Sequence, residues 1–158
     1  SDQVTVLKDK INSIDFGQNK LDYILIDCPP SLNLLTINAL VASDSVLVPL
    51  QAEFLPLEGL SQLMLSVKEI RDTANPGLRF EGIVLTMFDK RNNLSRQVED
   101  DVRDNLKGLV YQSVIPRSVK LSEAPSYGKS IFDYSPRSKG ASAYKALALE
   151  ILARHDVN

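Results

Sequence analysis

The stretch YILIDCPPSL, residues 23–32, indicates the fold class of this chain. An almost continuous apolar run over residues 22–27 predicts a β-strand buried on both faces, as is typical of parallel sheets. Asp27 closes the run, and two prolines then prevent a helix from beginning at once. Because open α/β sheets bind ligands at the carboxyl ends of their strands, we expect Asp27 to face a ligand cleft.

The rest of the chain alternates between strand and helix patterns. Further strands are predicted over residues 44–50, 79–88 and 111–115, and helices over 4–14, 32–42, 55–74, 95–110 and about 141–154. Ser31 and Ser95 are the expected N-caps of two of these helices, and Gly17 the expected C-cap of the first. This alternation predicts a single α/β domain over residues 1–158 with a mostly parallel sheet flanked by helices. Residues 116–140 are predicted to be mostly loop, and loops of that length are usually functional.

Composition narrows the class of function. A net charge of −2 and a pI near 5.4 give no global basic signal, so any nucleic-acid contact must come from a local patch. The lone Cys28 excludes an intramolecular disulfide and fits a reducing compartment. The single His155 argues against His-based catalysis or a His-rich metal site. No apolar run approaches the ~20 residues of a membrane span, and the polar N-terminus does not read as a signal peptide, so we expect a cytosolic domain.

Three strings give the chain a specific resemblance. They are residues 22–63, beginning DYILIDCPPSL; residues 82–98, GIVLTMFDKRNNLSRQV; and residues 114–144, VIPRSVKLSEAPSYGKSIFDYSPRSKGASAY. In this order they resemble ParA-type (Soj-like) chromosome- and plasmid-partitioning ATPases, and the resemblance covers residues of about 20–152. It implies a fold of the P-loop NTPase superfamily, in its deviant Walker A branch.

The resemblance also assigns roles to residues. Asp27 matches the Walker B aspartate and would help to hold Mg²⁺, directly or through water. The 28–34 segment would be the switch region that senses the γ-phosphate. Thr86, Pro116 and Arg117 are candidate contacts to the adenine of ATP. Thr86 fits a purely structural strand position equally well, whereas for the IPRSV string we favour the ligand site over a simple strand terminator.

One part of the family pattern is missing from this sequence. The family holds the phosphates of ATP in a Gly-rich P-loop, and no GxxxxGK[ST] string occurs here. The nearest match, YGKS at 127–130, has Glu123 where the first glycine is needed. We therefore expect an α/β fold that is incomplete at its N-terminal side, with exposed strand edges, and no ATP hydrolysis by this chain alone.

Basic residues suggest a second function. Arg91 and Lys120 match DNA-contacting positions of the family, although an arginine is usual at the second, and a solvated surface charge explains each of them equally well. Other loop cations are Arg117, Lys129, Arg137 and Lys139; for the last two, solvated charge is the favoured interpretation. The resemblance implies an intact protein that binds ATP and Mg²⁺, forms a homodimer on nucleoid DNA without sequence preference, and hydrolyses ATP when a ParB-type centromere-binding partner stimulates it.

Two alternatives remain open. MinD-like division-site ATPases share the Walker B region, but they carry a basic, amphipathic membrane helix. The last helix here, ASAYKALALEILARH, has a weakly charged polar face and few bulky anchors, which favours partitioning and no membrane contact. The other alternative is a truncated, non-catalytic paralogue that docks to DNA or to a protein partner and never binds nucleotide.

Overall fold

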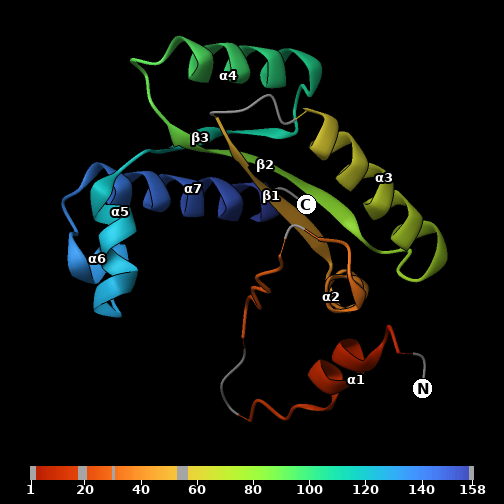
Figure 1. The fold of residues 1–158 in the computed structure, drawn as a ribbon. Helices are drawn as coiled ribbons and strands as arrows, with labels where there is room; N and C mark the ends of the chain where they lie inside the picture. The colour runs from red at the N-terminus through yellow and green to blue at the C-terminus, as the bar shows by residue number, and fades with distance from the viewer. Residues whose placement is uncertain (1–2, 18–20, 30, 53–56, 157–158) are drawn as a thin grey trace. The chain divides into compact units, whose positions relative to one another are not determined.

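The computed structural model describes residues 3–17, 21–29, 31–52 and 57–156 (Figure 1). Within these residues the chain divides into two compact units. One unit extends to Val46 and includes Gly59–Phe80, and the other holds Leu47–Glu58 and Glu81–Asn158.

The first unit is built on three helices, α1 (Val6–Ser13), α2 (Leu34–Ala42) and α3 (Leu57–Thr73). Its apolar core joins α2, α3 and the residue just before the strand that follows α3. The buried members of this core are Leu40, Val41, Val67, Ile70 and Leu78. Each of these helices overlaps its predicted range. The N-cap of α2 is Asn33, whose side chain accepts a hydrogen bond from the Thr36 N–H, and not the predicted Ser31. The end of α1 likewise differs, since its C-cap is Ile14 and not Gly17.

The predicted strand over residues 22–27 is wrong for this structure. Residues 21–29 form neither helix nor strand, and the side chains of Tyr23, Ile24 and Leu25 are 46%, 48% and 93% exposed. A strand needs a neighbour to accept its backbone hydrogen bonds, and an apolar sequence cannot supply one. Residues 21–29 therefore form an exposed segment outside the sheet that leads to Asp27, and not the exposed strand edge that was expected.

The sheet has the order β1–β2–β3, with β1 at Ser45–Gln51, β2 at Arg79–Phe88 and β3 at Val110–Pro116. All three match predicted strands, and β2 pairs in parallel with β3. The register of that pair shifts between Leu85 and Phe88, where Met87 has a φ of 54°. A β-bulge of this kind bends a strand and redirects its side chains, and bulges are common beside functional sites.

Helices cover the sheet of the second unit on both faces (Figure 1). Helix α4 (Asn93–Asn105) lies on one side, and helix α7 (Lys139–Asp156) packs on the other against β3. The N-cap of α4 is Asn92, so the prediction of Ser95 is wrong; Ser95 is completely buried. The connection predicted as loop contains short helical turns, α5 (Val119–Glu123), the 3₁₀ helix η1 (Ala124–Tyr127) and α6 (Ile131–Tyr134).

Helix α7 approaches α5 closely at a glycine. A Cβ on Gly140 would lie 2.7 Å from Cγ of Leu121, which is closer than real Cβ contacts allow. The glycine therefore lets the first turn of α7 pack on α5, beside the carboxyl end of β3.

Candidate functional site

An open pocket of about 310 Å³ lies at the carboxyl ends of the strands in the second unit. Its volume is at the small end of the roughly 300–1,000 Å³ that small-molecule sites occupy. The position agrees with the general rule for open α/β sheets, which bind ligands at this edge. The lining residues come from all three strands, α5 and α7: Gln51, Thr86, Met87, Ile115, Pro116, Ser118, Leu121, Ser122 and Tyr144.

Two of the three predicted base contacts meet in this pocket. Thr86 is the last residue before the bulge in β2, and Pro116 ends β3. Both are half-buried and line the same hollow. Arg117 follows directly but is exposed and is not one of the residues that line the pocket. Its backbone N–H donates a 3.0 Å hydrogen bond to the Phe88 carbonyl, which fixes the chain at the rim of the pocket.

Met87 gives the pocket a strained wall. It is the only non-glycine residue with positive φ among those that the structure describes. An L-residue held in the left-handed region costs about 1–3 kcal/mol, which the surrounding structure must supply. Strain of this kind concentrates at functional sites, and here it occurs in a residue that lines the pocket.

A carboxylate fixes the α7 wall of the pocket to β3. The Glu150 carboxylate accepts hydrogen bonds from the backbone N–H of Gln112 (2.7 Å) and of Ser113 (2.9 Å). It also accepts a bond from Arg154 at 3.3 Å, one turn further along α7. Burial alone would raise the pKa of Glu150. The backbone N–H groups of Gln112 and Ser113, a hydrogen bond with the Ser113 side chain and the charge of Arg154 together outweigh burial, and the pKa is lowered.

A second polar cluster lies one turn further along α7, at its C-terminal end. The buried Tyr111 donates its hydroxyl to the Glu81 carboxylate at 2.9 Å, and His155 lies 3.0 Å from the same oxygen. The Arg154 guanidinium stacks 3.7 Å from the Tyr111 ring. Burial raises the pKa of Tyr111 well above its usual range, and its bond to Glu81 raises it further. The hydroxyl is therefore a permanent donor, and we interpret this cluster as structural.

Asp27 belongs to the other unit. It is exposed at the end of the unpaired segment, next to the exposed Cys28. Within the described part of the chain, no three His, Cys, Asp or Glu side chains are grouped so that they could hold a metal ion. A lone carboxylate still fits Mg²⁺, which keeps several waters and takes its other ligands from nucleotide phosphates. Asp27 could thus bind Mg²⁺ only together with phosphates held by other groups.

Arg91 and Lys120 are exposed, and each has an acidic partner. Arg91 forms a two-pronged pair with Asp89 in the turn after β2, with a shortest distance of 2.9 Å. Hydrogen bonds from Arg91 lower the pKa of Asp89 to about 2. Lys120 lies 2.9 Å from Glu123, and that contact raises the lysine pKa. Exposed pairs of this kind contribute little to stability, so an incoming anion can replace either carboxylate at small cost.

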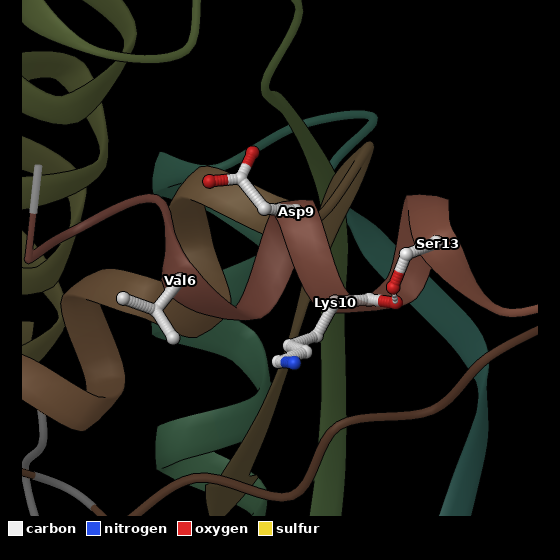
Figure 2. Close-up of a pocket in the computed structure, with 4 residues that line it drawn as sticks. All are labelled: Val6, Asp9, Lys10 and Ser13. Carbon is white, nitrogen blue, oxygen red and sulfur yellow. Dashed lines mark hydrogen bonds between the residues drawn. The ribbon is translucent and has the colours of Figure 1, made fainter. Parts of the chain in front are cut away.

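A second, shallow hollow lies on α1 (Figure 2). The lining residues Val6, Asp9, Lys10 and Ser13 all come from this one helix. Ser13 donates its hydroxyl to the Lys10 carbonyl at 2.8 Å, the dashed contact in Figure 2. Side chains from separate elements do not converge there, so the hollow has no arrangement suited to chemistry.

Sequence reasoning missed several residues of the strand-end pocket. Gln51, Met87, Leu121, Ser122 and Tyr144 line it without having been predicted individually. All five lie within the strings that carried the resemblance. Gln51 and Tyr144 are far along the chain from Thr86 and Pro116, and only the folded sheet brings them to this edge.

Known proteins resemble the chain along most of its length. A family model described as an AAA domain matches residues 1–80. The chromosome partitioning protein ParA of Caulobacter vibrioides is 50% identical over 148 residues, covering 94% of this chain and 55% of that protein. The sporulation initiation inhibitor protein Soj of Bacillus subtilis is 56% identical over 141 residues, covering 89% of this chain and 56% of that protein. The chain thus spans about half the length of these curated relatives.

Solved structures show the same fold. Cobyrinic acid a,c-diamide synthase from Mycobacterium smegmatis, with bound ADP and magnesium, matches with a TM-score of 0.74 at 34% identity, covering 94% of this chain and 53% of that chain. The cell division ATPase MinD of Pyrococcus furiosus matches with a TM-score of 0.73 at 28% identity, covering 95% of this chain and 58% of that chain.

The alternating elements, the strand-end pocket and these structural matches define the α/β fold of the P-loop NTPases, without the P-loop sequence itself in this chain. The chain belongs to the family described as an AAA domain. Its relatives at 50% identity and above include the chromosome partitioning protein ParA and the protein Soj. The fold class and the resemblance predicted from the sequence are confirmed. In the described residues, no helix is long and apolar enough to cross a membrane.

Proposed function

We propose that this chain carries the base-binding part of a partitioning ATPase site, while the phosphate cradle comes from a P-loop that this sequence does not contain. The observation that supports the proposal is the strand-end pocket, lined by both Thr86 and Pro116. The lining side chains are uncharged, which suits a nucleobase and not a phosphate group. A structural neighbour is described with ADP and magnesium bound, which agrees with nucleotide chemistry on this fold.

In the intact assembly, each part would have a separate task. The pocket would hold the adenine of ATP, and Asp27 would contribute one Mg²⁺ ligand. The metal, when bound, would neutralise charge on the β- and γ-phosphates during phosphoryl transfer. The P-loop would grip the phosphates through backbone N–H groups. Because this chain holds only the first two parts, we propose that it does not hydrolyse ATP alone.

Non-specific DNA binding is the second activity that we propose. Arg91 and Arg117 follow the carboxyl ends of the parallel neighbours β2 and β3, and Lys120 lies in the next helix, α5. Cations at one edge of a sheet can contact successive phosphates without reading bases. We also propose a homodimer, a ParB-type partner and a cytoplasmic, nucleoid-associated location, and similarity to a chromosome partitioning protein supports this. A MinD-like role is less well supported, because the chain is 50% identical to the chromosome partitioning protein ParA and 28% identical to the MinD structure.

The proposal is tested by binding of a non-hydrolysable ATP analogue with Mg²⁺. The chain is measured alone and fused to a Gly-rich P-loop segment from a family member, with Asp27→Asn as a matched variant of the fusion. We expect tight binding by the fusion only, weakened by Asp27→Asn. If the fusion folds correctly but does not bind the analogue, the assignment of a divided ATP site is contradicted.

A further inference from the structure

Tyr144 is the one aromatic residue among the described residues that line the strand-end pocket. It occupies a helical position that would normally be buried. Leu147, three residues further along α7, is 6% exposed and packs with Val84, Tyr111 and Ile115. Residues three apart share a helix face, yet Tyr144 is 41% exposed. The core-facing stripe of α7 therefore continues past the end of the sheet, and its last large side chain borders the pocket.

The ring is held on a rigid support. Glu150 ties α7 to the backbone N–H groups of Gln112 and Ser113, and Gly140 lets the first turn of the helix pack on Leu121. Tyr144 lies between these two fixed points. A ligand that covers the ring would therefore order little of the protein, and preorganisation of this kind favours binding.

The chemistry of the other walls identifies the class of ligand. Met87, Ile115, Pro116 and Leu121 are apolar, and the described lining contains no charged side chain. Thioethers and aromatic rings both make favourable contacts with flat π-systems. Hydroxyl and amide groups of Thr86, Ser118, Ser122 and Gln51 add a few neutral hydrogen-bonding positions. These features suit an uncharged, planar heteroaromatic ring with polar edges.

We propose that Tyr144 is a specificity-determining residue, which stacks on a purine base bound in this pocket. The inference rests on the proposed function, because it takes the base of the nucleotide as the ligand. It goes further in assigning the selective contact to Tyr144 on α7, a residue to which the resemblance assigned no role. A purine is favoured over a pyrimidine, because its two fused rings stack on more of the tyrosine face.

The test uses this 158-residue chain and nucleosides, so that the phosphate cradle is not required. Adenosine and uridine are titrated while the protein and base proton resonances are followed by NMR. We expect adenosine to bind more tightly than uridine, and its base protons to show the upfield shift that stacking on an aromatic ring produces. Tyr144→Leu should weaken adenosine binding about fivefold or more and abolish that shift. Tyr144→Phe, which keeps the ring, should retain both.

Leu149→Ala is the matched control on the same helix, since Leu149 is 57% exposed and does not line the pocket. It should bind adenosine as the natural chain does. Should Tyr144→Leu fail to fold, Tyr144→Gln takes its place. If the natural chain binds adenosine and the folded Tyr144 variants bind it equally well, the role of Tyr144 is overturned while the base pocket stands. If the natural chain binds neither nucleoside, the base pocket itself is wrong.

Discussion

Replacing Glu150 with glutamine tests how α7 is fixed to the sheet. The carboxylate accepts two short bonds from β3 backbone N–H groups, and its side chain is only 20% exposed. Hydrogen bonds to charged groups contribute about 1.5–3 kcal/mol each. Glutamine keeps one acceptor oxygen but turns an NH₂ donor toward the second N–H. We therefore expect Glu150→Gln to lower the free energy of unfolding by about 2 kcal/mol. In a chain of this length that corresponds to a fall in Tm of about 4–8 °C.

The assay is urea unfolding followed by circular dichroism, over a range of pH. Because folding lowers the pKa of Glu150, its contribution is fully present above the ordinary value of 4.5 and is lost as pH falls through the lower folded value. The difference between natural chain and variant should therefore shrink on acidification. The exposed Asp101→Asn, on α4, is the control for removal of a negative charge. A variant as stable as the natural chain near neutral pH, or a difference that is undiminished near pH 3, would refute the reasoning.

Three further predictions concern DNA contact, backbone strain and a buried amide. Arg91→Ala and Lys120→Ala should each weaken non-specific binding to duplex DNA, measured by fluorescence anisotropy. Each should also reduce the slope of log affinity against log salt concentration by about one. Lys107→Ala is the control, because Lys107 lies before the amino end of β3, and it should leave that slope unchanged. Met87→Ile should lower the free energy of unfolding in urea by about 1–2 kcal/mol more than Met87→Leu does, because a β-branched residue tolerates a φ of 54° poorly. Equal losses of stability in the two variants would contradict the assigned strain. Asn75→Ala should lower the unfolding free energy by about 2–3 kcal/mol, because its amide donates to two carbonyls at the end of α2, at 2.9 and 2.7 Å; a neutral result would contradict that role.

The three strands β1, β2 and β3 were predictable because their apolar sequence patterns agree with their positions in the folded sheet. Residues 79–88 match β2 at both ends, and the predicted 44–50 and 111–115 differ from β1 and β3 by one residue at each end. The segment at 22–27 has an equally strong apolar pattern but no paired neighbour in the described residues. Periodicity measures which side chains favour burial, and it cannot show that a partner strand is available.

Smaller errors have local causes. Ser95 looked like an N-cap, yet Asn92 caps α4 three residues earlier and places the serine on the buried face. The turns α5, η1 and α6 have four or five residues each, which is too short for a helical period to be visible.

Some residues of the candidate site were predicted from the sequence, and others were not. Thr86 and Pro116 were named because the resemblance to the partitioning ATPases placed base contacts there, and the structure brings both to the same pocket near the carboxyl ends of two parallel strands. Tyr144 and Gln51 were not predicted, because they reach the pocket only through the packing of α7 on β3 and the position of β1 in the sheet. The ligand-binding roles of all six predicted site residues remain predictions: Asp27, Thr86, Pro116, Arg117, Arg91 and Lys120.

The central claim is that this chain binds the base of a nucleotide but not its phosphates. The most direct test compares the affinities of adenosine and of ATP with Mg²⁺ for the chain alone, by calorimetry or NMR titration. We expect the two affinities to agree within about threefold, a difference of less than about 1 kcal/mol in binding free energy. Binding of ATP more than about tenfold tighter than adenosine would show that the chain holds its own phosphate site, and would contradict the account.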